Sequence, residues 1–101
     1  MSTIFHISSK ADWELAKING FYVAPALKEE GFIHCCHENQ VEDILSKYYT
    51  DRKDILCLRI ETDKLTSQYI FEWSPSLEQT FPHVYGPINI DAVESVIEYS
   101  L

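Results

Sequence analysis

The feature that most constrains the fold of this sequence is residues 55–60, Ile-Leu-Cys-Leu-Arg-Ile, which are apolar at every position except Arg59. A short, nearly continuous apolar run is typical of a central strand that is covered on both faces of a sheet. Cys57, in the middle of the run, is expected to be a small buried hydrophobic residue. Any fold for this chain must therefore cover both sides of this strand.

Two helices are expected, both in the first half of the chain. The first spans residues 9–19, because Ser9 and Asp12 form an approximate capping box and Asn19-Gly20 supplies a left-handed stop. The second begins at His37 or Asn39 and runs to about residue 49. The apolar positions at helical spacing are Ala11, Leu15 and Ile18 in the first helix, with Trp13 and Ala16 extending that face, and Val41, Ile44, Leu45 and Tyr48 in the second.

The remaining apolar segments are short and predict strands. They are residues 3–7, 21–24, 31–36, 68–73 and 93–99. We expect residues 26–30 to form a solvated loop or a single turn, residues 61–66 a turn or short helix, and residues 74–80 a polar loop. Helices confined to the first half indicate one α+β domain over residues 1–101, in which mostly antiparallel strands pack against two early helices. A doubly wound parallel sheet would need helices between the later strands.

Composition narrows the classes of function. Apolar residues make up 46% of the 101 residues and charged residues 24%, a balance typical of one folded domain and not of a disordered chain. The formal net charge of −8 argues against non-specific binding to nucleic acid or to an anionic membrane. No apolar run approaches the length of about 18 residues that a membrane span needs. Three cysteines without a visible signal peptide indicate reduced thiols, and we expect a cytoplasmic protein.

Residues 31–39, Gly-Phe-Ile-His-Cys-Cys-His-Glu-Asn, concentrate two of the four histidines and two of the three cysteines at positions 34–37. In a strand, side chains alternate between faces, so Phe32, His34 and Cys36 would share one face and Ile33 and Cys35 the other. These groups then do not converge as a ready-made zinc knuckle. We expect a buried strand that delivers His34 to a pocket.

Three histidines, His6, His34 and His83, are expected at or near strand ends. Histidine titrates near neutral pH and can donate or accept a proton, so converging histidines suit proton transfer or the orientation of a substrate hydroxyl. Glu30 or Glu72 could supply a carboxylate. His37, at the start of a helix, is expected to make a surface or capping contact.

The residues alone leave three kinds of site open. A zinc site could use His6, His34, Cys36 and His83, although no known spacing is matched. A Cys–His nucleophile could pair Cys35 or Cys36 with His6 or His83. The third possibility is a histidine-lined pocket for a ligand that carries ribose.

A resemblance to a known family favours the third possibility. The blocks that carry it span nearly the whole chain: residues 4–7 (Ile-Phe-His-Ile), Trp13, residues 30–35 (Glu-Gly-Phe-Ile-His-Cys), Glu72, and residues 81–87 (Phe-Pro-His-Val-Tyr-Gly-Pro). Together they resemble the bacterial domain-of-unknown-function family 952 (DUF952). That family has no established activity, and the resemblance implies a fold similar to that of ADP-ribosyltransferases.

The order of elements is also similar to that of the catalytic domains of poly-ADP-ribose polymerases. Residues 5–8, Phe-His-Ile-Ser, stand where those enzymes carry a His-Gly-Ser motif, and residues 19–25 resemble the glycine and strand that follow the first helix. The resemblance implies that His6 holds the ribose of NAD by its 2′-hydroxyl and that His34 lines the nicotinamide side of a cleft. His83 falls near the position of the catalytic glutamate.

Two departures from that pattern change the expected activity. Ile7 replaces the glycine of the motif, and His83 replaces a carboxylate, so ordinary protein ADP-ribosylation is not expected. A histidine-based site is closer to the RNA 2′-phosphotransferase branch of the superfamily. That branch is basic because it binds RNA, whereas this chain is acidic, so a small nucleotide fits better.

The resulting hypothesis is a cleft that binds NAD or an ADP-ribose-like ligand and transfers an ADP-ribosyl or phosphate-type group. The expected catalytic residues are His6, His34 and His83, and the expected ligand-binding residues are His6, Ser8, Tyr22, His34, Glu72 and Tyr85, with no metal. One alternative is a non-catalytic ligand-binding module of the same fold. Another is that the histidines only satisfy buried polar contacts.

Overall fold

The computed structural model describes residues 2–99. Its strands are β1 (Thr3–Ser9), β2 (Phe21–Tyr22), β3 (Ile33–His34), β4 (Ile55–Glu61), β5 (Tyr69–Ser74), β6 (Gln79–Val84), β7 (Ile88–Asn89) and β8 (Val93–Tyr99). Its α-helices are α1 (Lys10–Asn19), α2 (Pro25–Glu30) and α3 (Val41–Tyr48), and short 3-10 turns cover Glu38–Gln40, Thr62–Lys64 and Ile90–Ala92. No helix within this range is both long and apolar enough to cross a membrane.

The strands form two three-stranded sheets and one short pair. The first sheet has the order β1-β4-β8, the second has the order β3-β6-β5, and β2 pairs with β7. Every strand pair among the described residues is antiparallel. The α+β class, the antiparallel arrangement and the central place of β4 are therefore confirmed.

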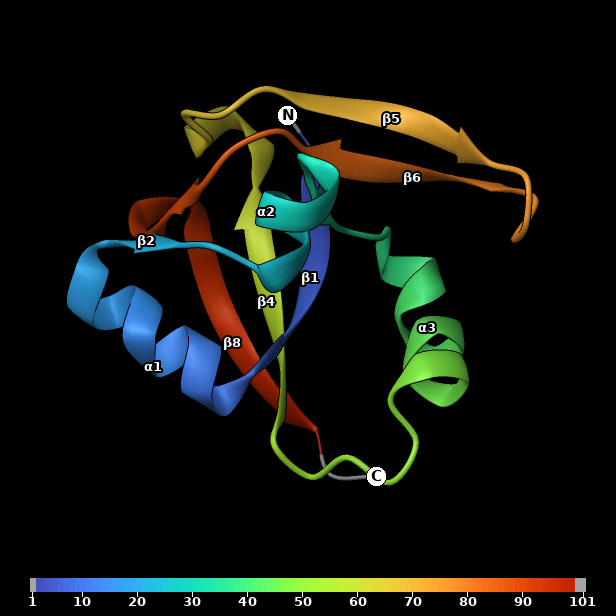
Figure 1. Cartoon of the computed structure of the whole chain (residues 1–101), viewed down its shortest axis with the longest axis horizontal. Helices are drawn as coiled ribbons and strands as arrows, with labels where there is room; N and C mark the ends of the chain where they lie inside the picture. The colour runs from blue at the N-terminus through green and yellow to red at the C-terminus, as the bar shows by residue number, and fades with distance from the viewer. Residues whose placement is uncertain (1, 100–101) are drawn as a thin grey trace.

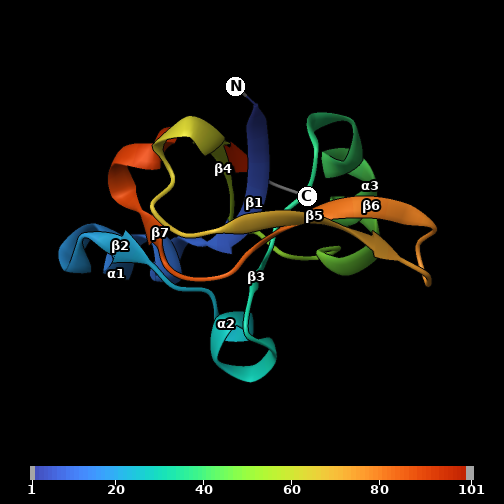
Figure 2. The same cartoon turned by 90° about the horizontal axis from the view of Figure 1, so that it is seen from above.

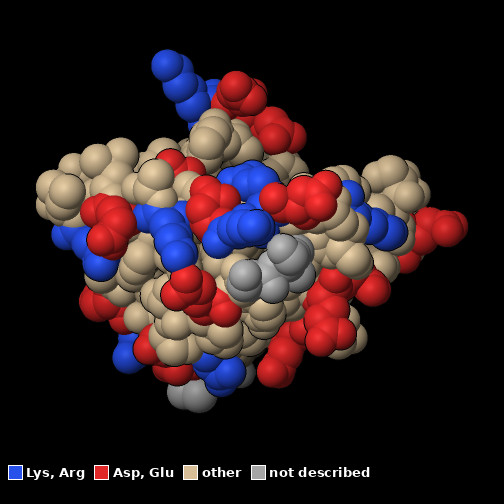
Figure 3. Space-filling model, turned by 90° about the horizontal axis from the view of Figure 1, so that it is seen from below, with Lys and Arg blue, Asp and Glu red and all other residues tan. Residues whose placement is uncertain are grey.

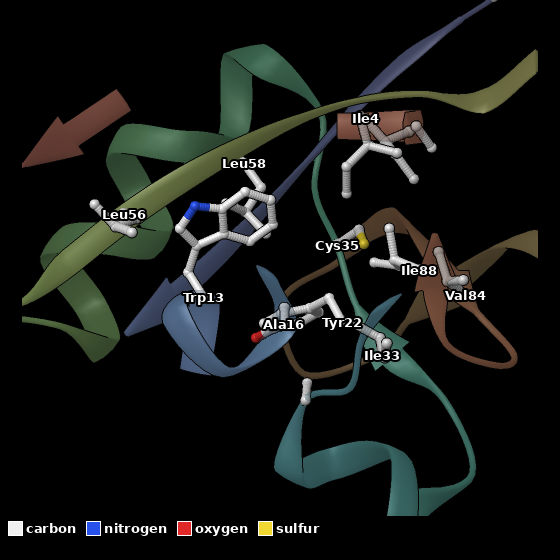
Figure 4. Close-up of a cluster of buried hydrophobic side chains, with 13 residues drawn as sticks. Ile4, Trp13, Ala16, Tyr22, Ile33, Cys35, Leu56, Leu58, Val84 and Ile88 are labelled. Carbon is white, nitrogen blue, oxygen red and sulfur yellow. The ribbon is translucent and has the colours of Figure 1, made fainter. Parts of the chain in front are cut away.

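Helices α1 and α3 lie on opposite sides of the β1-β4-β8 sheet (Figure 1). Alternate residues of β4 face two separate cores, as the alternation of side chains along a strand requires. Leu56 and Leu58 pack with Trp13 of α1 in what we name the α1-side core (Figure 4). Cys57 packs with Leu45 of α3 in what we name the α3-side core. Cys57 is buried, as its place in the central run predicts.

Residues 31–36 join the two three-stranded sheets. After β3, the Cys35 N–H donates to the Pro82 carbonyl of β6 at 3.0 Å. Cys36 then exchanges two backbone hydrogen bonds of 2.7 and 2.8 Å with Phe5 of β1. Figure 2 shows β3 leading from α2 toward the level of β5 and β6. The strand expected over residues 31–36 is thus regular only at Ile33–His34. Beyond β3, Cys35 and Cys36 continue the backbone hydrogen bonds to neighbouring strands.

Helix α1 has the expected ends, and Trp13 and Ala16 of its expected apolar face are buried. The Ser9 hydroxyl accepts from the Asp12 N–H at 3.1 Å, and Gly20 ends the helix with a φ of 87°. Leu15 and Ile18, however, are 56% and 81% exposed. The face with Trp13 meets the sheet instead, because burying an indole removes more apolar surface from water than burying a leucine.

Three helices, not two, occupy the first half of the chain. The segment expected as a loop or single turn is α2, which has a proline in its first turn and ends at Gly31 with a φ of 87°. Proline is favoured at the start of a helix because its missing N–H would have no helical partner there. Strand β2 ends at Tyr22, two residues earlier than expected.

The second expected helix is α3, which begins at Val41 after the 3-10 turn over Glu38–Gln40 and so starts later than expected. His37 is the N-cap residue of the 3-10 turn before α3, and its N–H donates to the Gln40 side chain at 2.8 Å. Val41 and Leu45 are buried, as their spacing predicts. Tyr48 is exposed, because α3 ends there and Tyr49 packs on the α3-side core in its place.

Candidate functional site

The expected site residues fall into two groups at different depths. His6, Ser8 and Tyr22 are buried, and we name them the buried group. The second group lies at the surface around the facing histidines of β3 and β6. We name it the surface cluster, and its members are Glu30, Phe32, His34, Glu72, His83 and Tyr85.

His6 lies in the middle of β1, opposite Leu58 of β4, and not near the end of a strand as expected. Strand β1 continues to Ser9 because β4 pairs with it along its whole length. The His6 Nδ1 is 2.6 Å from the His34 carbonyl oxygen, and its Nε2 is 2.7 Å from the Tyr22 hydroxyl. A carbonyl only accepts, so Nδ1 donates to it and Nε2 accepts from Tyr22.

Burial determines the ionisation of this group. His6 is 6% exposed, and burial lowers its pKa to about 4, so the ring is neutral at neutral pH. Burial raises the pKa of the Tyr22 hydroxyl, which keeps it a hydrogen-bond donor. The Ser8 hydroxyl donates to the Ser9 carbonyl at 2.8 Å. The buried group is therefore a neutral hydrogen-bonded chain that links β2 to β1 and β1 to the backbone of β3.

The surface cluster is built around two histidines that face each other. His34 of β3 pairs directly with His83 of β6, and the centres of their rings are 5.5 Å apart. The Phe32 ring stacks on His83 at 4.1 Å and meets the edge of His34 at 4.8 Å. Phe32 was not predicted as a site residue from the sequence. The one signal for it was the alternation of side chains along the strand, which places Phe32 on the same face as His34.

Glu72 connects His83 to Tyr85. Its Oε1 accepts from the His83 Nδ1 at 2.8 Å and also from the Tyr85 hydroxyl. Both hydrogen bonds lower the pKa of the Glu72 carboxyl, and the one from Tyr85 has the larger effect. The hydrogen bond between Tyr85 and Glu72 also raises the pKa of Tyr85. With Nδ1 donating to a carboxylate, the Nε2 of a neutral His83 carries the lone pair.

His34 has a carboxylate of its own. Its Nε2 is 3.0 Å from an oxygen of Glu30, the last residue of α2, and both side chains are about half exposed. The ring nitrogen Nδ1 remains as the second polar atom of His34. Sequence reasoning gave Glu30 no firm role, because the helix that places it beside His34 was not expected.

The members of the surface cluster include two carboxylates, Glu30 and Glu72, and no lysine or arginine, although Lys28 lies in the same helix as Glu30. Among the described residues, the ion pairs of Lys10, Lys17, Arg52 and Arg59 involve carboxylates outside the cluster. Figure 3 shows the opposite side of the molecule from β5 and β6, where basic and acidic side chains are interspersed. A ligand at the cluster therefore meets two carboxylates and two histidines.

The cluster is open to solvent on one side. Two hollows, of about 530 and 270 Å³, lie between α3 and β8 instead. Glu42 and Tyr99 line both of them, and neither includes a histidine. The surface cluster is thus an open surface and not a pocket, and a ligand there would keep part of its own surface in water.

The two other kinds of site receive no support from the geometry. All three cysteines are buried, and burial raises the pKa of Cys36 to about 12, raises that of Cys57 to about 11 and also raises that of Cys35. Such thiols stay protonated and are poor nucleophiles. Within residues 2–99, no three histidine, cysteine or acidic side chains converge as metal ligands.

Comparison with known proteins finds one family and one set of solved structures. The family model described as "Protein of unknown function (DUF952)" matches residues 7–96. The crystal structure of CC0527 from Caulobacter crescentus is 26% identical, with a TM-score of 0.89 over 99% of this chain and 88% of that one. The solution structure of CC0527 is 25% identical, with a TM-score of 0.80 over 100% and 87% of the two chains. No curated protein matches. The likeness therefore establishes the fold, and the chemistry has to be argued from the side chains.

Proposed function

The chain belongs to the DUF952 family of proteins of unknown function, and we propose that it binds NAD or an ADP-ribose-like ligand at the surface cluster and transfers an ADP-ribosyl or phosphate-type group. The order of helices and strands supports, as part of this proposal, a relation to the ADP-ribosyltransferase fold. The catalytic groups are His34 and His83. Glu72 and Tyr85 bind the ligand.

The observation that carries the proposal is the hydrogen bond of 2.8 Å between the His83 Nδ1 and Glu72. A carboxylate behind one ring nitrogen fixes the tautomer and turns the other nitrogen toward a reacting group. The stacked Phe32 ring holds the imidazole plane. His83 is thereby oriented as a general acid or base for a ribose-bearing substrate.

The neighbouring polar groups suit a ribose. A carboxylate oxygen accepts hydrogen bonds from sugar hydroxyls, which is how acidic residues recognise the ribose of dinucleotides. The Glu72 Oε1 already accepts from His83 and Tyr85, so the other carboxylate oxygen is the acceptor for a ligand, and the Tyr85 hydroxyl, which donates to Glu72, can accept from one. Phe32 adds an apolar ring against which the sugar or a base can lie.

His6 has a different role in this proposal from the one that the family resemblance implied. Both of its ring nitrogens have protein partners, so it holds the carbonyl of His34 and does not hold the ribose. Tyr22 in turn fixes the ring of His6. The buried group thus fixes the backbone of β3 at His34, and with it the position of the surface cluster.

A thermal-shift titration tests the proposal. A ligand at about 100 times its dissociation constant stabilises the folded state by about 2.7 kcal/mol, which raises Tm by roughly 10 °C or more in a domain of this size. We expect such a shift with NAD or ADP-ribose in the wild type and a much smaller one in His83→Ala. His37→Ala, a histidine outside the cluster, serves as the control and should keep the shift.

The same titration can contradict the proposal. If NAD, ADP-ribose and nicotinamide leave Tm unchanged at millimolar concentration, or if His83→Ala shifts as much as the wild type, the surface cluster is not a site for these ligands. A shift that survives His83→Ala but disappears in His37→Ala would move the site to His37 and the Phe71 ring of β5 that it contacts.

The openness of the surface cluster favours a second candidate function, a non-catalytic binding module. An open surface can recognise an ADP-ribose group while leaving its anomeric carbon in water, where the protein contributes little to catalysis. Kinetics and binding of His83→Ala separate the two. Both functions predict a weaker affinity in His83→Ala, but an enzyme shows turnover in the wild type that His83→Ala loses, whereas a binding module shows no turnover in either protein.

A further inference from the structure

We propose that His34 and His83 form a general acid–base pair that acts on an O-linked ribosyl group, so that the substrate loses an alcohol from the anomeric carbon of its ribose. This inference rests on the proposed function, because it needs a ribose-bearing ligand at the surface cluster. It selects one of the reactions that the proposed function leaves open. Three features of the cluster lead to it.

The first feature is the duplication of the histidine–carboxylate contact. His83 donates to Glu72 and His34 donates to Glu30, and each imidazole keeps one further ring nitrogen. The direct pairing of β3 with β6 places the two ring centres 5.5 Å apart. One histidine alone would suffice for a single proton transfer, whereas two that face each other can serve an attacking and a departing oxygen together.

The second feature is the charge of the cluster. Phosphoryl transfer places negative charge on the transferring group, and proteins stabilise it with lysine, arginine or magnesium. Both Glu30 and Glu72 add negative charge through carboxylates that contact the two histidines, whereas neither histidine forms a contact with a lysine or arginine among the hydrogen bonds and ion pairs of the described residues. Transfer of a ribosyl group instead develops positive charge at the sugar. The cluster therefore favours glycosyl over phosphoryl transfer.

The third feature concerns the leaving group. The nicotinamide of NAD departs as a neutral base and needs no proton, so an acid beside it would have no task. An alcohol departs as an alkoxide unless an acid protonates it in the transition state. A site that holds both an acid and a base thus fits an oxygen leaving group better than it fits nicotinamide.

Besides the ribosyl substrate, the reaction needs only water or an acceptor alcohol. His83, held by Glu72 and by the Phe32 ring, removes the proton from the attacking hydroxyl as its oxygen bonds to the anomeric carbon. The bond between that carbon and the leaving oxygen breaks, and protonated His34 gives its proton to that oxygen. His34 is about half exposed and regains a proton from solvent, while His83 releases one.

Two O-glycosides of ADP-ribose test the inference, one that releases methanol and one that releases 4-nitrophenol. We expect the wild type to cleave both, and His83→Ala to lose at least about 100-fold in rate on both, the usual contribution of a general base. His34→Ala should lose a similar factor on the methyl glycoside and little on the nitrophenyl glycoside, because 4-nitrophenolate leaves without a proton. His37→Ala is the matched control and should cleave both as the wild type does.

Two further probes give the outcomes that overturn the inference. Release of nicotinamide from NAD without cleavage of either glycoside, or hydrolysis of bis(4-nitrophenyl) phosphate in preference to them, would show another reaction. Equal losses in His34→Ala on both glycosides would remove the acid role of His34. A thermal shift with ADP-ribose separates the two levels: binding without glycoside cleavage refutes this inference alone, and no binding refutes the proposed function as well.

Discussion

At the scale of single residues, His6 and His83 show how the same side chain serves two purposes. His6 has both ring nitrogens bonded inside the protein, to the His34 carbonyl and to Tyr22, and it is almost fully buried. His83 has one nitrogen on Glu72 and lies in a surface cluster. The chain gives no local sign of this difference, because both are histidines within short apolar segments. Only the pairing of β1 with β4 and of β3 with β6 separates them.

The burial of His6 predicts how stability depends on pH. The unfolded chain takes up a proton near the ordinary pKa of 6.5, while the folded state resists protonation down to about pH 4. The unfolded state then binds more protons between these values, so the free energy of unfolding falls as pH falls from about 6.5 to 4, by about 3 kcal/mol in all. Urea unfolding at several pH values measures it.

Two variants control for the other titrating groups. His6→Gln can still donate to the His34 carbonyl and accept from Tyr22 but does not titrate, so its stability should change less over the same range. His37→Gln removes a histidine outside the buried group and should retain the slope of the wild type. Equal slopes in His6→Gln and the wild type would refute the assignment of this pH dependence to His6.

At the scale of elements, the capping residues gave the ends of α1 correctly, whereas its buried face was predicted only in part, because Trp13 and Ala16 are buried but Leu15 and Ile18 are exposed. Ser9 and Gly20 act locally, through one hydrogen bond and one backbone conformation, so they can be recognised without the rest of the fold. Which face is buried depends on the partner. Trp13 competes with Leu15 and Ile18 for the sheet, and spacing alone does not decide between faces that both carry apolar residues.

The N-cap of α1 offers a prediction of its own. Ser9→Ala removes the acceptor of the Asp12 N–H, so we expect a loss of about 1 kcal/mol in the free energy of unfolding. Ser46→Ala is the control, because the Ser46 hydroxyl donates to carbonyls within α3 at an exposed position and should matter little. Chemical denaturation compares the two, and equal effects would show that the cap does not stabilise α1.

At the scale of the whole molecule, the fold class, the central strand and several members of the surface cluster could be predicted, but the arrangement of that cluster could not. The apolar run of β4 requires layers on both sides, and the structure supplies them with α1 and α3. The pairing of His34 with His83 depends on the register between β3 and β6, which are far apart in sequence. That register is set by the buried neighbours Ile33 and Val84, a contact that no local pattern contains.

The two cores make a matched prediction possible. Leu58→Ala creates a cavity in the α1-side core, where the side chain is fully buried, and should cost about 2–5 kcal/mol. Ile18→Ala removes a side chain of similar size from the surface of α1 and should change stability by less than about 0.5 kcal/mol. Denaturant midpoints give both values. A loss for Ile18→Ala comparable to that for Leu58→Ala would mean that its exposed face is covered in solution.

The junction formed by residues 31–36 has a consequence for synthesis of the chain. Its backbone partners are Phe5, near the start, and Pro82, near the end, so a growing chain carries His34 long before the strand that faces it has left the ribosome. Apart from the β5–β6 hairpin, strand pairs such as Phe21 with Asn89 join distant parts of the sequence. Proteins rich in such long-range pairings fold slowly, on the order of milliseconds to seconds. The surface cluster therefore cannot form before β6 is synthesised, and a nascent chain that stops before β6 carries His34 without its partner His83.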